Sequence, residues 1–260
     1  MVDRMRRREF ITHFVAAAAI SLCPAYAEKG VLNLGFDSAE KSTELLAAFR
    51  EGLRTLGFVD NQNVAIEYAF AEGQYDRFPE LVATLVKNNV RVIVAATGTN
   101  GVLATTAATK TIPIVFAIAM DPVSVGVVSS LNRPGGNATG VSMYTPQLVA
   151  KRLELLAELT PAGGTIAMLI NPTNPNADVI SSDAEAAAKS LGRQLYVLRA
   201  STDQKIATAF DEIRDRKYVA LLVSPDAFYI ARREQLAALC EQNRIPAIYE
   251  WSLFVKMAGL

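Results

Sequence analysis

Histidine and cysteine are nearly absent from this sequence, and their absence excludes several kinds of chemistry. The 260 residues include one histidine, His13, and two cysteines, Cys23 and Cys240. His13 and Cys23 fall within residues 1–27, which are predicted below to be removed. A chain without histidine has no Ser-His-Asp or Cys-His relay and no histidine-ligated zinc site. One remaining cysteine cannot form an internal disulfide, so we expect the core alone to hold the fold and Cys240 to be a buried thiol.

An excess of charge of either sign is also lacking. The chain has 26 basic and 26 acidic residues, of which four basic and two acidic residues lie in residues 1–27. The remainder therefore has 22 basic and 24 acidic residues, a net charge of −2. This balance gives no electrostatic footprint for nucleic acid or anionic lipid, and no nucleic-acid partner is predicted.

Residues 1–27 have the pattern of an export signal. Arginines at positions 6–8 precede the apolar run Phe14–Cys23, and Ala25-Tyr26-Ala27 is a small-x-small cleavage pattern. The run is too short to cross the roughly 30 Å of a bilayer core as a helix. Arg7-Arg8 followed by Glu-Phe-Ile resembles a twin-arginine signal, which predicts secretion to the periplasm by that route, with the general secretory route as the alternative. Leu22 before Cys23 disfavours a lipoprotein, and an uncleaved anchor or a disordered basic tail are the other interpretations.

The rest of the chain alternates short β-branched runs with helical patterns, which predicts an α/β fold with parallel sheets and right-handed crossovers. A turn-rich patch before Tyr144 separates two series of strands, so we predict an N-terminal lobe over residues 30–144 and a C-terminal lobe over 145–260. Gly57 is expected to end the first helix, and Ser201 with Gln204 to form a capping box. The predicted strands are Val31–Phe36, Asn63–Phe70, Val90–Ala96, Ile112–Phe116, Thr139–Met143, Thr165–Ile170, Gln194–Arg199, Tyr218–Val223 and Pro246–Tyr249.

Ligands of open α/β sheets bind beyond the carboxyl ends of the strands, which selects a short set of candidate residues. Thr97, Gly98 and Thr99 follow the third strand and open a helix, where N–H groups and hydroxyls suit a carboxylate or a phosphate. The alternative is an ordinary helix cap without a ligand. Polar and aromatic residues also follow other strands, each of which taken alone could be only a cap or a packing residue. These further candidates are Ser38, Asp121, Asn171, Asn174, Asp226, Tyr249 and Glu250.

A set of segments distributed along nearly the whole chain after residue 27 shares one resemblance. The segments are Ala71–Arg77, Ile112–Phe116, Asp121–Val123, Leu131–Asn137, Lys151–Leu156, Asn171–Asn176, Arg232–Leu236 and Ile245–Glu250. They resemble the ABC-transporter substrate-binding family related to tryptophan-binding proteins, which has a type I periplasmic-binding fold. The resemblance implies two Rossmann-like lobes joined by a hinge that close over a small molecule, and a monomeric binding protein, not an enzyme, without a cofactor or a metal. It also implies that a C-terminal part of the usual chain is missing after Leu260.

The resemblance further implies roles for the candidate residues. Ser38, Thr97, Gly98 and Thr99 are expected to receive an anionic end of the ligand, and Asp226 or Glu250 a cationic end such as an α-ammonium group. Tyr144, at the crossover, is expected to cover the ligand. The implied ligand is an amino acid or an aromatic carboxylate, delivered to an ABC transporter permease in the membrane.

Three other functions also occur on α/β folds of this kind. A flavodoxin-like or hydrolase enzyme would lack the usual histidine base. A transcription regulator would need a DNA-binding helix pair, which residues 1–27 do not supply. A periplasmic sensory protein that presents its ligand to a membrane receptor would need the same closure, so the sequence leaves this alternative open.

Overall fold

The computed structural model describes residues 32–38, 43–143, 148–174, 176–250 and 254. The predicted export signal, the candidate Tyr144 and the junction between the predicted lobes lie outside the described residues. The chain divides into two compact units, Met1–Met143 (unit 1) and Tyr144–Leu260 (unit 2). Each unit is described by itself.

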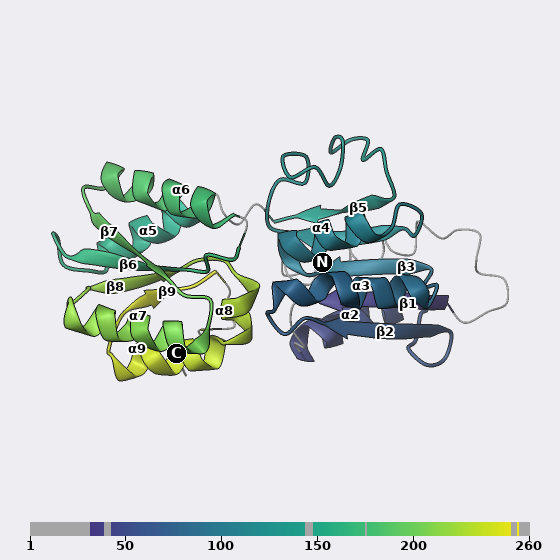
Figure 1. Cartoon of the computed structure of the whole chain (residues 1–260), viewed down its shortest axis with the longest axis horizontal. Helices are drawn as coiled ribbons and strands as arrows, with labels where there is room; N and C mark the ends of the chain where they lie inside the picture. Colours follow the sequence, from purple (N-terminus) through teal and green to yellow (C-terminus); the bar gives the residue numbers. More distant parts are fainter. Residues whose placement is uncertain (1–31, 39–42, 144–147, 175, 251–253, 255–260) are drawn as a thin grey trace, which may run out of the picture. The chain divides into compact units, whose positions relative to one another are not determined.

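Unit 1 contains a five-stranded parallel sheet with the strand order β2-β1-β3-β4-β5 (Figure 1). The order reverses between β1 and β3, so the connections leave this point toward opposite edges of the sheet. Its elements are β1 (Leu32–Ser38), α2 (Thr43–Thr55), β2 (Val64–Phe70), the 3-10 turn η1 (Tyr75–Arg77), α3 (Phe78–Lys87), β3 (Val92–Ala96), α4 (Gly98–Ala108), β4 (Ile114–Ile118) and β5 (Ala138–Ser142).

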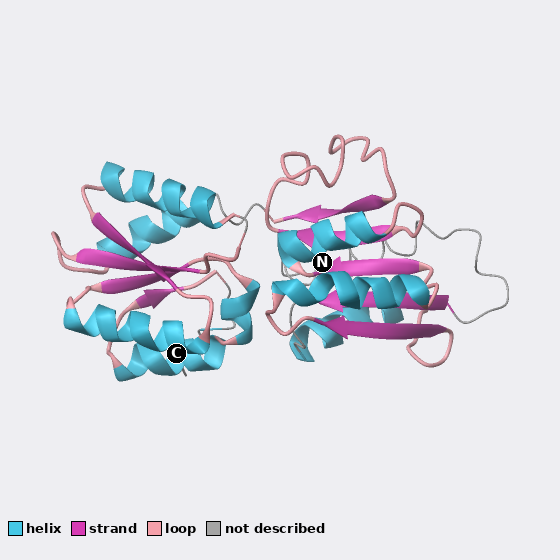
Figure 2. Cartoon of the chain, viewed as in Figure 1, coloured by secondary structure: helices cyan, strands magenta, loops and turns pink. Residues whose placement is uncertain are grey.

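Unit 2 contains a four-stranded parallel sheet with the strand order β7-β6-β8-β9, covered by helices on both faces (Figure 2). Here the order reverses between β6 and β8. Its elements are α5 (Val149–Glu158), β6 (Thr165–Ile170), α6 (Ala177–Ser190), β7 (Gln194–Arg199), α7 (Asp203–Asp215), β8 (Ala220–Val223), α8 (Ala227–Ala231), α9 (Arg233–Gln242) and β9 (Ala247–Ile248).

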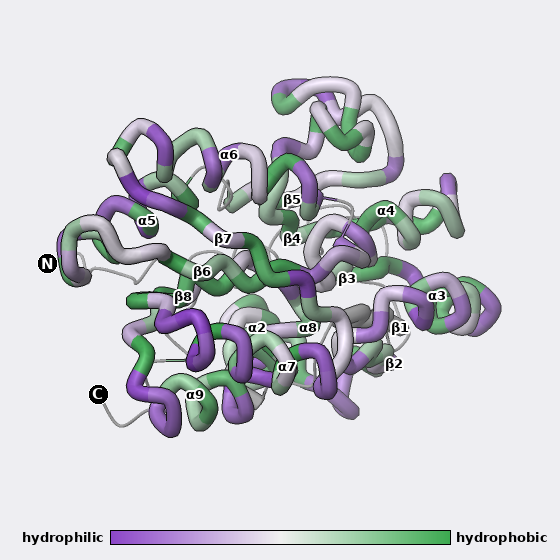
Figure 3. The backbone as a smooth tube through the Cα atoms, turned by 60° about the vertical axis from the view of Figure 1, so that its left-hand side comes forward, coloured by the Kyte–Doolittle hydropathy of each residue, from purple (hydrophilic) through white to green (hydrophobic). Residues whose placement is uncertain are grey.

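Side-chain alternation along the strands builds a core on each face of each sheet. In β3, Val92 and Val94 pack with α2, whereas Ile93 packs with α3. In unit 2, Ile166 and the other even-numbered residues of β6 pack with α5 and α6, and its odd-numbered residues pack with α7 and α9. Strands buried on both faces carry continuous apolar runs, because helices cover both sides of a parallel sheet. Figure 3 shows the complementary pattern in α7 and α9, whose turns alternate between hydrophilic and hydrophobic residues.

The predicted α/β architecture with parallel strands is confirmed, and every predicted strand run overlaps a strand of the described structure. Gly57 follows the end of α2 with φ +84°, a left-handed conformation that glycine adopts without strain. The predicted capping box at Ser201 is wrong by one residue: Thr202 is extended and its hydroxyl accepts from the Lys205 N–H at 3.2 Å. β9 is shorter than predicted at both ends, and at its start Pro246 has no N–H to donate.

No helix among the described residues combines the length and the apolar character needed to cross a bilayer.

Candidate functional site

In unit 1, the two strands at the reversal point end side by side. Ser38, the last residue of β1, is in register with Ala96, the last residue of β3, so Ser38 and Thr97 lie at the same carboxyl edge. The side chain of Ser38 lies outside the described part of the chain. Ligands of open α/β sheets bind at such a reversal point. The structure therefore places these two predicted residues where a ligand of unit 1 is expected.

The helix that follows β3 begins without a side-chain cap. Thr97 occupies the N-cap position of α4, but its hydroxyl reaches only the Gly98 carbonyl, at 3.4 Å, and bonds no N–H of the first turn. Gly98 has φ +73°, which a residue with a Cβ rarely adopts. Thr97 and Thr99 are buried, and the Oδ1 of Asn100 is buried with no hydrogen-bond partner among the described residues. The uncapped N–H groups of this first turn suit an anion at the start of a helix, whereas the Asn100 oxygen would need a donor.

Glycine at position 101 keeps this loop in place. A Cβ at Gly101 would collide with the side chain of Thr97, which lies over the first turn of α4. The glycines in the segment 97–101 therefore serve two needs, a left-handed turn at Gly98 and close side-chain packing at Gly101.

Asp121, the third candidate of unit 1, closes a turn after β4. Its Oδ1 accepts from the Val123 N–H at 2.9 Å, and the neighbouring Met120 carbonyl accepts from the Ser142 hydroxyl at 2.7 Å. These bonds fit the structural interpretation of Asp121, which is that of an aspartate that stabilises its own turn.

In unit 2, three predicted residues from two loops meet in one hydrogen-bond cluster. Asp226 Oδ1 accepts from Asn171 Nδ2 at 3.2 Å and from the Phe228 N–H at 2.8 Å, and its Oδ2 accepts from Asn174 Nδ2 at 2.8 Å. Asn171 follows β6 and Asp226 follows β8, which are neighbours in the sheet although 55 residues separate the two side chains in sequence. Asp226 is thus the N-cap of α8 and also the centre of the cluster, with 5% of its surface exposed.

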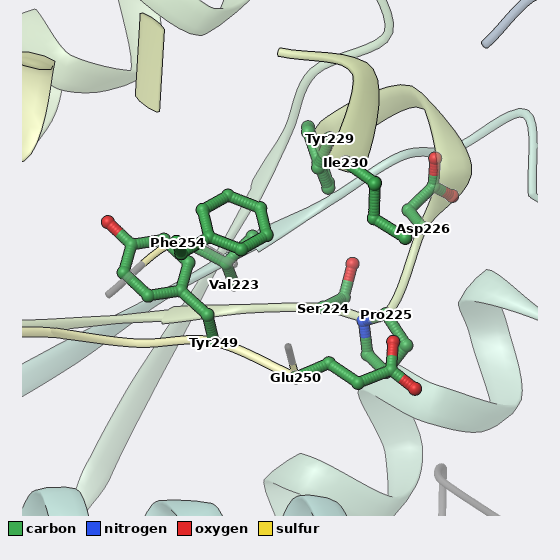
Figure 4. A pocket seen from close by; sticks show the side chains of 9 residues that line it. All are labelled: Val223, Ser224, Pro225, Asp226, Tyr229, Ile230, Tyr249, Glu250 and Phe254. Carbon is green, nitrogen blue, oxygen red and sulfur yellow. The ribbon is translucent and has the colours of Figure 1, made fainter. Parts of the chain in front are cut away.

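A small hollow of about 10 Å³, with room for about one water molecule, lies beside this cluster at the carboxyl edge of the sheet (Figure 4). Figure 4 shows Tyr249 and Phe254 together on one side and Asp226 with Glu250 on the other. The other lining residues are Val223, Ser224, Pro225, Tyr229 and Ile230. The volume is below the roughly 300–1,000 Å³ of pockets that enclose a small ligand alone. The hollow is therefore too small to enclose a small ligand by itself.

The aromatic residues of the pocket are fixed by the core behind them. The ring of Tyr249 stacks on Phe254 with centroids 4.2 Å apart, and its hydroxyl donates to Cys240 Sγ at 3.1 Å. The hydroxyl of Tyr229 donates to the Ala200 carbonyl at 2.8 Å. Burial raises the pKa of both tyrosines above the usual value, and the charge of Asp226 adds to the rise at Tyr229. Both side chains thus offer neutral aromatic rings to the pocket.

Arg152 is a functional candidate that the sequence interpretation missed. It lies in the first half of α5 on the face that packs on the sheet, next to Val149 and Leu153, and only 8% of its surface is exposed. Burial lowers the pKa of its guanidinium group, and the charge of Glu250 opposes that change. An arginine at an apolar position of the helical repeat was the signal in the sequence.

Cys240 is confirmed as a buried thiol. Burial raises its pKa to about 11, so only about 0.1% would be thiolate at pH 8. We expect a thiol reagent to modify Cys240 in the native protein at least about a hundredfold more slowly than in guanidinium chloride, as followed by absorbance. The Cys23→Ser variant keeps Cys240 as the one thiol. Equal rates in the native and denatured protein would contradict the burial.

Metal ligands do not gather in the described residues: no three Cys, Asp, Glu or His side chains there are grouped as ion ligands would be.

Comparisons with known proteins agree with this architecture. The model of a family described as ABC transporter substrate binding protein matches residues 37–260. The chain is 27% identical over 200 residues to a tyrosine-binding protein of Clostridioides difficile, covering 77% of this chain and 57% of that protein. The chain thus spans little more than half the length of this curated relative.

Two solved structures share the fold. A conserved domain protein of Vibrio cholerae is 26% identical, with a TM-score of 0.75 over 88% of this chain and 77% of that one. An ABC domain of Streptococcus pneumoniae in complex with L-Trp is 23% identical, with a TM-score of 0.71 over 88% of this chain and 83% of that one.

Proposed function

The chain belongs to the ABC transporter substrate binding protein family, and we propose that it captures an amino acid or an aromatic carboxylate outside the cytoplasm for an ABC transporter. Its family is one of binding proteins and not of enzymes. The observation that carries the ligand class is the edge of unit 2, where a buried carboxylate and aromatic rings line the same pocket.

Asp226 is proposed to bind the cationic end of the ligand. Three groups that donate to it, Asn171, Asn174 and the Phe228 amide, are neutral and orient the carboxylate. A carboxylate held in this way in a buried site favours a positive partner far more than one in water does. The α-ammonium group of an amino acid supplies such a partner.

The loop at the start of α4 is proposed to bind the anionic end of the same ligand. Ser38, Thr97, Gly98 and Thr99 are its members, with Asp121 at the edge and Tyr144 as a cover. Support comes from the helix start, whose first-turn N–H groups have no side-chain cap. The part of the proposal in which both units close on one molecule rests on the family resemblance.

The side chain of the ligand is proposed to be aromatic. The relative from Clostridioides difficile is named a tyrosine-binding protein, and the structural relative from Streptococcus pneumoniae holds L-Trp. In this chain the aromatic rings of Tyr249, Phe254 and Tyr229 lie next to Asp226, although Phe254 and Tyr229 are at most 2% exposed. An aromatic ring stacked there would gain roughly 0.5–1.5 kcal/mol beyond the burial of its area.

The family and residues 1–27 support a proposal for the localisation of the protein and for its partner. Substrate-binding proteins of this family are extracytoplasmic. We propose that residues 1–27 direct export to the periplasm by the twin-arginine route, that the protein works as a monomer, and that its partner is the permease of the transporter.

A thermal-shift screen of the purified protein with amino acids and aryl carboxylates tests the ligand class. A ligand at about 100 times its Kd adds about 2.7 kcal/mol of stability. For a domain of this size that is a rise in Tm of roughly 5–10 °C. We expect tyrosine or tryptophan to give such a rise, and glycine, which lacks the ring, to give less. A folded protein whose Tm no amino acid or aryl carboxylate raises at millimolar concentration would overturn the proposal.

A further inference from the structure

A groove of about 370 Å³ lies at the amino edge of the sheet of unit 2. It is formed by the last turn of α7 and by the loops that lead from α7 into β8 and from α9 into β9. Both helices pack on the same face of the sheet (Figure 1). The hollow beside Asp226 is lined by residues that follow β8 and β9, whereas the groove is lined by residues that precede them, so the two lie at opposite edges. The volume of the groove is within the roughly 300–1,000 Å³ of pockets that bind small molecules.

Apolar side chains of the core form part of the lining of this groove. Ile213 and Ile245 belong to the buried core under α7 and α9, and Tyr218 packs against that core. The ring of Tyr218 also stacks on Tyr196, with centroids 5.4 Å apart. Backbone hydrogen bonds close both loops. The Tyr218 N–H donates to the Ile213 carbonyl at 3.1 Å, and the Ile245 N–H donates to the Cys240 carbonyl at 3.0 Å. The apolar lining is therefore fixed by the core behind it.

The charged residues that line the groove are all basic. They are Arg214, Lys217 and Arg244, and no acidic residue is among the described residues of the lining. Arg214 is paired with Asp211 at 2.9 Å and with Asp215 at 3.2 Å. Lys217 and Arg244 are exposed, and neither has an ion pair within the described part of the chain. Two cationic side chains therefore border an apolar lining without a partner of opposite charge in the described structure.

Lys217 and Arg244 have corresponding positions beyond the ends of α7 and α9. Lys217 has φ +54° and Arg244 has φ +52°, the left-handed conformation in which many helices end. Glycine adopts this conformation without strain, as Gly57 does after α2. The negative end of a helix dipole favours a cation here, so helix stability alone could account for each charge. A role in helix stability and a role in ligand binding differ in what the loss of the two charges does to the affinity for an anion.

We propose that this groove is a second binding site, which takes a small organic anion with a flat apolar body, such as an aryl carboxylate. The apolar lining at Tyr218, Val219 and Ile245 covers the body of the ligand, and an aromatic body gains from the ring of Tyr218. Lys217 and Arg244 bind the acidic group from two different loops. The inference does not depend on the proposed function, because the proposed amino-acid site uses the opposite edge of the sheet.

The test uses two fluorescent probes that differ only in the acidic group, 1-anilinonaphthalene-8-sulfonate and the uncharged N-phenyl-1-naphthylamine. Fluorescence titration of the purified protein gives the Kd of each probe. We expect the sulfonate to bind at least about tenfold more tightly than the uncharged probe, because it meets two cations. The double variant Lys217→Asn with Arg244→Asn should abolish this preference. Asparagine is neutral and tolerates the left-handed conformation, so this variant should fold.

The matched control is Lys189→Gln with Lys205→Gln. Both lysines are exposed residues of unit 2 outside the groove, so the control changes the net charge by the same amount. It should keep the preference for the sulfonate. Circular dichroism establishes which variants fold, and if the double asparagine variant does not, the two single variants decide. If the asparagine variants change Tm but not the Kd of the sulfonate, the cations serve only the helices and the inference is wrong.

Displacement of the bound sulfonate identifies the occupant of the groove. We expect 2-naphthoate to displace it and millimolar L-tyrosine not to. If L-tyrosine displaces the probe, the probe reports the amino-acid site and the inference is wrong. If poly-L-glutamate displaces it at a lower carboxylate concentration than 2-naphthoate does, the groove takes an acidic polypeptide, and the inference of a small ligand is again wrong. A protein that binds the sulfonate as expected but no amino acid or aryl carboxylate elsewhere would overturn only the proposed function.

Discussion

Replacing Asp226 by asparagine is expected to weaken amino-acid binding by about a hundredfold while lowering the free energy of unfolding by only about 1–2 kcal/mol. Asparagine keeps one oxygen that can accept from the Phe228 N–H, so the cap of α8 survives. Its amide group faces Asn174, which also donates, and one hydrogen bond of the cluster is lost. The charge is lost completely, and the charge is what the ligand's ammonium group requires. Calorimetry measures the affinity for the amino acid, and urea unfolding measures the free energy of unfolding.

Asp226→Ala completes this prediction because it removes the cap as well. Three donors then lose their acceptor, and we expect a stability loss of about 2–4 kcal/mol with at least the same loss of affinity. Thr202→Ala is the matched control, since it removes the cap of α7 from the same unit without touching the pocket. Its expected cost is about 1 kcal/mol in stability and nothing in affinity. An asparagine variant that binds like the wild type would reduce Asp226 to a structural cap.

The fold was predictable because parallel strands leave a strong trace in a sequence. Val92–Ala96 and Thr165–Ile170 are buried on both faces and carry uninterrupted apolar runs, so their positions could be read directly. The exact starts of helices were less certain, because they depend on which single hydroxyl caps the first turn. The cap of α7 is Thr202 and not Ser201 because the chain becomes extended at Thr202, and no residue pattern shows that.

The candidate site was predictable in its parts but not in its connections. Asn171, Asn174 and Asp226 were each expected to lie after a strand, yet their hydrogen bonds depend on β6 and β8 being neighbours although β7 lies between them in the sequence. The sequence also left the choice between a cap and a binding group open at Asp226, and the structure shows that it caps α8.

Arg152 was missed for a different reason. Helical periodicity treats a charged residue as exposed, and Lys151 and Glu154 beside it are exposed and paired with each other. Arg152 falls instead on the stripe of Val149, Leu153 and Leu156, where the packing side of the helix is buried. A charge on the apolar stripe of a helix near a strand edge is the pattern to search for in related chains.

Phe210→Ala is expected to lower the free energy of unfolding of unit 2 by about 3–5 kcal/mol, the cost of a large cavity in a closed core. Phe210 is 2% exposed in α7 and packs in the cluster that also holds Tyr229, Cys240 and Phe254. Urea unfolding followed by circular dichroism measures the change. Leu159→Ala, at a side chain that is 79% exposed, is the control and should change stability by no more than about 0.5 kcal/mol.

Phe210→Ala should mainly lower stability, whereas Asp226→Asn should mainly lower affinity for the ligand. Phe210 does not line the pocket, so molecules of Phe210→Ala that are folded should bind with nearly the wild-type Kd. Asp226→Asn should instead stay folded and lose affinity. A Phe210→Ala variant that loses less than about 1 kcal/mol would show that α7 is not packed on the sheet as described, because surface substitutions alone have effects that small. A variant that loses affinity in proportion to its stability would show that the core and the pocket form one cooperative unit.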